Sequence, residues 1–179
     1  MRSWAITAVL LLSTTPVSAD HIGIYDDIYG GPCFGPPPAM SVPFTMYILH
    51  EQSAGTIGGR WTVVSSTNNL IPLTYQCAGG ISLPFNPIDG MSASYGGCVV
   101  SPINACQVMY LSLGAPFEGC NHLTVEPSSG DSEIQVLDCA QQFHDATGGH
   151  FSFSLSGNCD TCVLAAEQTT WGAIKSMYR

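Results

Sequence analysis

Cysteines and histidines hold most of the chemistry that this sequence could perform, with eight of the first and five of the second. The most closely spaced cysteines form the CxxC motif Cys159-Asp-Thr-Cys162. In a thiol oxidoreductase, such a motif lies at a helix N-terminus, which lowers the pKa of the first thiol. That chemistry needs a βαβ context, whereas the surrounding sequence predicts strands. Structural disulfides are therefore the favoured interpretation, and thiol redox catalysis is the alternative.

The first 19 residues support a structural role for the cysteines. A basic start at Arg2 is followed by an apolar stretch and by Val17-Ser18-Ala19, small residues typical of a signal-peptidase site. We therefore predict a signal peptide over 1–19 and a protein secreted to the periplasm or the cell exterior, where disulfides form and persist. The disulfide candidates, whose pairing the sequence alone does not decide, are Cys33, Cys77, Cys98, Cys106, Cys120, Cys139, Cys159 and Cys162.

A copper site is a second alternative. If the chain were cut after Asp20, the amine and imidazole of His21 could chelate copper together with a second imidazole, a donor set that suits this metal. The second ligand would come from His50, His122, His144 or His150. Cleavage after Ala19 fits the small-residue rule better, so we expect His21 to begin the first strand. No metal and no cofactor is predicted.

Other catalytic signatures are missing from the sequence. It contains no GxSxG, no HExxH and no P-loop. The acidic pairs Asp26-Asp27 and Asp131 with Glu133 offer oxygen ligands for calcium, but without EF-hand spacing they indicate solvated loops. An aromatic ligand platform is conceivable, although such side chains in a β-sandwich are usually core; its members would be Tyr29, Phe34, Trp61 and Tyr95.

Charge excludes some classes of partner. Charged residues make up 9% of the chain, with 13 acidic and four basic side chains, of which Arg2 lies in the signal peptide. The mature chain would carry a formal charge of −10, which repels phosphate backbones and anionic lipid. We therefore predict no nucleic acid partner. No second apolar run reaches the roughly 18 residues that a membrane-spanning helix needs.

Alternation of apolar and polar residues predicts an all-β fold. Strand-sized runs separated by turn residues fit a sandwich or a partly open barrel. The weak region 65–97 is punctuated by proline and glycine, and the loop 30–38 should be neither helix nor strand. The predicted strands are Ile22–Tyr25, Phe44–His50, Gly59–Val64, Cys98–Val100, Gln107–Leu113, His122–Glu126, Glu133–Asp138 and Gly149–Ser156.

The last residues break the pattern. Trp171, Ile174, Lys175 and Tyr178 follow helical spacing and form one stripe of a short amphipathic helix. We therefore predict a disulfide-stapled domain over 20–163 and a C-terminal tail over 164–179, with Trp171, Ile174 and Tyr178 as tail contact candidates. The tail either docks on the domain or is recognised by a partner or an export machine.

Three passages together resemble uncharacterised small secreted bacterial β-sandwich proteins with a Gly-Ile-Tyr first strand. They are 22–27 with the proline-rich cysteine loop and the strand 44–49, the stretch 136–162 with its closing CxxC, and the tail 170–179. The resemblance implies a secreted β-sandwich of unknown function and supplies no catalytic residues. Cys77 and Cys106 fall outside its pattern.

These observations predict an antiparallel, immunoglobulin-like β-sandwich that acts as a secreted, non-catalytic binding or structural module. Its partner would be an unknown protein or glycan surface. The alternatives are a copper or thiol-redox enzyme, and an extracellular assembly subunit that uses its tail.

Overall fold

Strands make up all of the regular structure in the described part of the chain. The computed structural model describes residues 20–51, 55–79, 90–100, 102–114, 120–154 and 159. Within these ranges there is no helix, and so none that could span a membrane. The strands are β1 (Asp20–Tyr25), β2 (Phe34–Gly35), β3 (Pro43–Glu51), β4 (Thr56–Ser65), β5 (Leu70–Cys77), β6 (Met91–Val99), β7 (Ile103–Ser112), β8 (Asn121–Glu126), β9 (Ile134–Asp138), β10 (Phe143–Gly148) and β11 (His150–Phe153).

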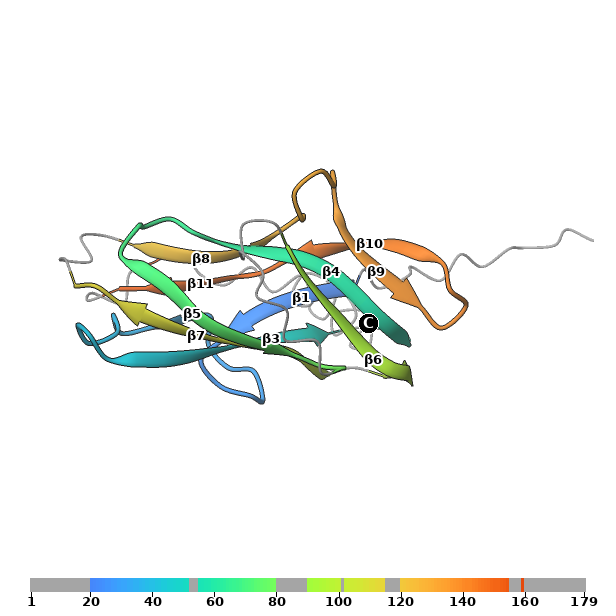
Figure 1. The fold of residues 1–179 in the computed structure, drawn as a ribbon, viewed down its shortest axis with the longest axis horizontal. Coiled ribbons are helices and arrows are strands. Elements are labelled where there is room, and N and C mark those ends of the chain that lie inside the picture. Colours follow the sequence, from blue (N-terminus) through green and yellow to red (C-terminus); the bar gives the residue numbers. More distant parts are fainter. Residues whose placement is uncertain are drawn as a thin grey trace, which may run out of the picture.

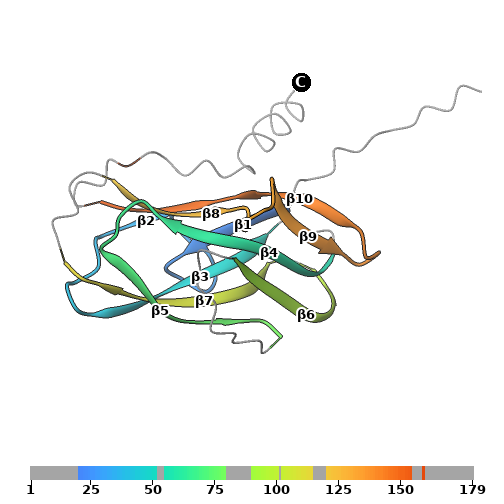
Figure 2. The same ribbon diagram turned by 45° about the horizontal axis from the view of Figure 1, so that its top comes forward.

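The strands form two facing layers, with β3, β5 and β7 in one and β8, β11 and the end of β4 in the other (Figures 1 and 2). One hydrogen-bonded path, β2-β11-β8-β4-β9-β10-β1-β3-β7-β5, connects them, and β6 pairs with β4 outside this path. Most neighbours are antiparallel, but β1 pairs with β10, and β2 with β11, in parallel. The prediction of an antiparallel sandwich is thus right for most pairs and wrong for these two.

Two chain segments pass from one layer to the other. The first half of β4 pairs with β6 and β9, whereas its second half, from Thr62 to Ser65, pairs with β8. The second crossing is the step from β10 to β11 at Gly148 and Gly149. A side chain at Gly148 would overlap the carbonyl oxygen of Val125, so only glycine allows this close approach.

The core fills the space between the layers. Its largest fully buried side chains are Trp61 on β4 and Phe151 on β11, beside Ile22 and Ile24 of β1. The ring of Phe44 on β3 contacts Phe153 on β11 edge-on, with ring centroids 5.7 Å apart, and so joins the two layers. Alternation along each strand therefore places one face of every long strand in a single core.

The sequence analysis did not predict three of the strands, β2, β5 and β10, or most of a fourth, β6. The proline-rich loop contains Phe34 and Gly35, which pair with β11, so the prediction that 30–38 holds no strand is wrong there. The region 65–97 contains β5 and most of β6. Strand β10 was also missed, because its exposed, polar sequence shows no apolar alternation. The predicted signal peptide over 1–19 and most of the tail, with Trp171, Ile174 and Tyr178, lie outside the described residues.

Candidate functional site

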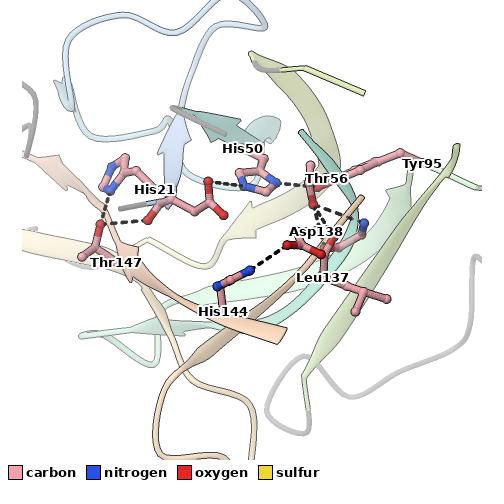
Figure 3. A network of polar contacts seen from close by, with 10 residues as sticks. His21, His50, Thr56, Tyr95, Leu137, Asp138, His144 and Thr147 are labelled. Atoms are coloured by element: carbon pink, nitrogen blue, oxygen red, sulfur yellow. Dashed lines mark hydrogen bonds and ion pairs between the residues drawn. The ribbon is translucent and has the colours of Figure 1, made fainter. Parts of the chain in front are cut away.

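Two buried histidines occupy neighbouring register positions of the β1–β3 pair, and their side chains point to opposite sides of it (Figure 3). His21 lies on β1 and is 4% exposed, and His50 lies on β3, opposite Ile22 of β1, and is fully buried. The Thr147 hydroxyl on β10 donates to the Asp20 carbonyl at 3.3 Å and lies 2.9 Å from Nδ1 of His21. Because that hydroxyl has one proton, its oxygen accepts from Nδ1–H of His21. The neutral tautomer of His21 is thereby fixed.

His50 is less well satisfied. Its Nδ1 lies 3.3 Å from the hydroxyl oxygen of Tyr95 on β6. Its Nε2 makes no hydrogen bond with the described residues, and the nearby carboxylate oxygen of Asp20 is 3.8 Å away. Burial lowers the pKa of His50 to about 4, and the electrostatic interaction with the nearby His21 imidazole acts in the same direction. Burial also lowers the pKa of His21, against the opposing effect of Glu51.

This arrangement is a buried polar cluster of neutral imidazoles. A general base must lie within hydrogen-bond reach of a substrate proton and have a pKa near the working pH. His50 is fully buried and its pKa lies well below neutrality, so it does not meet these conditions. The cluster contributes to the packing of β1 against β3 and β10.

The histidines named as copper ligand candidates are spread over the fold. His50 alone shares a cluster with His21. His122 on β8 packs against His150 on β11 with ring centroids 5.6 Å apart, and His144 on β10 bonds Asp138. Within the ranges that the structure describes, no group of three or more His, Cys, Asp or Glu side chains is placed to hold a metal ion. Asp131, a calcium candidate, instead forms an ion pair with Arg60 at 3.5 Å.

The cysteines join strands. Cys77 of β5 is bonded to Cys106, its register partner on β7, with 3.9 Å between their Cα atoms. Two further disulfides are Cys98–Cys139, from β6 to the turn after β9, and Cys120–Cys159, from the start of β8 to the segment after β11. Cys33 is also disulfide-bonded, and Cys162 lies outside the described residues.

The partner of Cys159 decides against redox catalysis. Because Cys159 is bonded to Cys120, the CxxC motif does not form the internal disulfide that a thiol oxidoreductase uses. The redox alternative is therefore wrong as framed, and these bonds staple the fold. The proposed aromatic platform is also divided: Trp61 is core and Tyr95 packs against the core, whereas Tyr29 and Phe34 are exposed.

The surface that sequence reasoning missed is the outer side of β3, β7 and β5, which we call the β3-β7-β5 face. Outward residues from the three strands lie in rows, such as Thr45, Met109 and Thr74, or Pro43, Leu111 and Ile71. No Asp, Glu, Lys or Arg occurs on β5 or β7. The exposed aliphatic side chains here, with their exposed fractions, are Met109 (39%), Ile71 (40%), Leu73 (45%) and Leu113 (45%).

A signal for this face was present in the sequence. From Trp61 to Phe117, the single charged residue is Asp89. A long uncharged stretch that is not apolar enough to be all core must leave uncharged side chains at the surface. Which strands it would build, and which residues would face outward, depended on pairings that the sequence did not reveal.

Comparisons with known proteins identify the fold. No family model matches the chain, and no curated protein sequence matches it. Several solved structures are similar, two of which are cohesin modules. One is a cohesin module from a family 33 glycoside hydrolase of Clostridium perfringens, with a TM-score of 0.53 and 11% identity over 78% of this chain and 97% of the module.

The other is the sixth cohesin of scaffoldin B from Acetivibrio cellulolyticus, solved in complex with a Cel5 dockerin. Its TM-score is 0.52, with 10% identity over 76% of this chain and all of the cohesin. At these identities the likeness concerns the fold: this chain has a cohesin-like β-sandwich.

Proposed function

We propose that this chain is a secreted, non-catalytic protein-binding module that holds its partner on the β3-β7-β5 face. The observation that carries the proposal is a face of three paired strands that exposes aliphatic side chains, with no charged residue on β5 or β7. The centres of protein interfaces are depleted of charged residues in the same way. Exposed apolar patches on secreted domains usually mark contact sites.

The disulfide under this face supports the proposal. Cys77–Cys106 ties β5 to β7 directly across the strand pair, and both sulfurs lie on the buried side. The outward side chains of these strands are therefore held on a rigid support, which lowers the entropy that a partner must remove on binding. Pro72 interrupts β5 at the outer edge, which disfavours pairing with another strand. A partner would thus use the face rather than the edge.

Cohesin-like architecture agrees with a binding role, since the similar cohesin of scaffoldin B was solved with a bound dockerin. The secreted location, the bacterial origin, the immunoglobulin-like character of the sandwich and the resemblance to small secreted bacterial proteins are parts of this proposal. So is a role for the tail residues Trp171, Ile174 and Tyr178 in contacting a neighbour.

The test compares two equally exposed apolar positions on opposite layers. Met109→Lys places a charge on the β3-β7-β5 face, and Val64→Lys does so on β4, where Val64 is 41% exposed. Each variant and the unmodified chain is immobilised and exposed to the culture medium of the source organism. We expect a protein that the unmodified chain and Val64→Lys retain and that Met109→Lys loses by at least about tenfold, the effect of 1.4 kcal/mol.

Matching circular dichroism spectra and unfolding midpoints show that both variants are folded. Equal retention by the three proteins would reject this face as the binding site. A partner lost only from Val64→Lys would move the site to the other layer.

A further inference from the structure

Strand β1 is attached to the rest of the molecule differently from every other described strand. The first of the eight cysteines is Cys33, so no disulfide can hold residues 20–32. Each of the other described strands lies between two disulfide-bonded cysteines along the chain. Release of β1 therefore breaks hydrogen bonds and packing but no covalent bond.

The place that β1 occupies is nevertheless central. β1 pairs in parallel with β10 on one side and antiparallel with β3 on the other. Ile22 and Ile24 are almost completely buried in the core, and the Tyr25 hydroxyl donates to the Glu51 carboxylate at 3.1 Å. The Tyr25 ring lies over Gly23, where a Cβ would overlap it. A vacated site would thus be filled best by another strand with the sequence of β1.

Docking of β1 also carries a local cost. It buries His21 itself and covers His50, whose Nε2 then lacks a hydrogen bond within the described structure. In the described part of the chain, the only facing group is the Asp20 carboxylate, 3.8 Å from this nitrogen, and a buried polar atom that makes no hydrogen bond is destabilising. Because water can hydrogen-bond His50 once β1 leaves, this cost makes β1 easier to detach than its burial suggests.

The segment after β1 is suited to act as a hinge. Residues 26–32 are exposed apart from Gly30, which is intermediate and has a φ of 76°. Gly31 is exposed and, as a glycine, has access to a wide range of backbone conformations. Fully extended, the seven residues span about 23 Å, enough to carry β1 towards a second molecule.

We propose that β1 exchanges between two copies of this chain, so that β1 of each copy docks between β10 and β3 of the other. Such an exchange recreates every contact of the monomer in a closed two-fold dimer. Asp20 and His21 of one copy then complete the histidine cluster of its partner. The exchange does not use the β3-β7-β5 face, so it stands apart from the proposed binding function.

The experiment uses the register pair His21 and Glu51, which lie opposite each other on β1 and β3. Copies with His21→Cys are mixed with copies with Glu51→Cys at high concentration. A cycle of sub-denaturing guanidinium and dilution opens β1 without full unfolding, and oxidation follows. Non-reducing electrophoresis and peptide mapping then identify crosslinks. We expect disulfide-linked dimers joined through residues 21 and 51.

A matched control comes from β3 and β7, where Thr45 and Met109 are register partners. Copies with Thr45→Cys mixed with copies with Met109→Cys should give no crosslink between chains, because both strands lie between disulfide-bonded cysteines. A single chain with both His21→Cys and Glu51→Cys locks β1 in place and should lose the dimer.

Light scattering on the unmodified protein keeps the proposal testable if a cysteine variant misfolds. After the same cycle, the unmodified chain should contain a dimer that survives dilution, and deletion of Gly30 and Gly31 should raise its share, since a shortened hinge favours exchange. A chain that stays monomeric at all concentrations would overturn the proposal. A dimer without a 21–51 crosslink, or one that persists in the locked variant, would do the same.

Discussion

The β3-β7-β5 face and the β9–β10 hairpin lie on either side of β1. They differ in the number of charged side chains and in how far polar side chains bond each other. The hairpin carries Asp138 and Asp145, and its polar side chains bond each other: Gln135 donates to Asp145 at 3.0 Å, and His144 lies 2.8 Å from Asp138. On the face, β5 and β7 carry no Asp, Glu, Lys or Arg, and aliphatic side chains such as Met109 are exposed to solvent.

This difference indicates which region would contribute more free energy to binding a partner. Charged groups that already bond within the hairpin would have to give up those bonds or carry them into an interface, and exposed ion pairs return little on binding. The aliphatic side chains of the face release water without losing any bond. The charge of the hairpin therefore favours contact with water, whereas the β3-β7-β5 face is the region whose burial by a partner would gain most.

The largest effect should come from removing the disulfide under each region. By chain entropy, loops of 29 and 41 residues give Cys77–Cys106 and Cys98–Cys139 a stabilisation of about 4 kcal/mol each. We expect the paired alanine variants to lose similar unfolding free energy in guanidinium titrations. Partner affinity should fall more for Cys77→Ala/Cys106→Ala, because only that bond supports the face.

Equal loss of affinity in the two disulfide variants would mean that general stability, rather than the rigidity of β5 and β7, controls binding. The comparison between the regions would then lose its functional meaning.

Acid should act at the seam between the two regions, where β1 joins β3. The pKa of His50 is about 4 in the fold and about 6.5 in an unfolded chain, so the unfolded state binds more protons between these values. Stability is complete above about pH 6.5 and falls towards pH 4, by about 3 kcal/mol in total. Neighbouring charges come from Asp20 and His21, and Tyr95 stays neutral because burial raises its pKa.

Unfolding free energies at pH 7.5 and pH 4.5 measure this effect. His50→Phe should remove most of the pH dependence in that window, whereas His144→Gln, at an exposed site, should leave it unchanged. If His50→Phe kept the slope of the unmodified chain, another group would be responsible for the acid sensitivity.

Regular alternation made much of the fold predictable. The alternating apolar residues Phe151 and Phe153, and likewise Ile134 and Val136, predicted a strand with one buried face. The structure has strands β11 and β9 at these positions. β5 was missed because Pro72 argues against a ladder, although an edge strand with a bulge tolerates it.

The candidate sites were less predictable for a physical reason. The burial of His21 and His50 at the β1–β3 pair, and the rows that build the β3-β7-β5 face, depend on pairings between distant parts of the chain. Those registers are set by the whole core, and no local pattern in the sequence encodes them. The pairing of Cys159 with Cys120 rather than its CxxC neighbour has the same origin.

The smallest effect is expected on the hairpin itself. His144→Gln removes the contact with Asp138, whose pKa is lowered first by the backbone N–H of Gln142 and then by His144. Because the backbone bond at 2.7 Å remains, the carboxylate keeps its main partner. We expect no measurable change in unfolding midpoint or in partner binding at neutral pH. A clear loss of binding in His144→Gln, with Met109→Lys unaffected, would reverse the comparison and place the interface on the acidic hairpin.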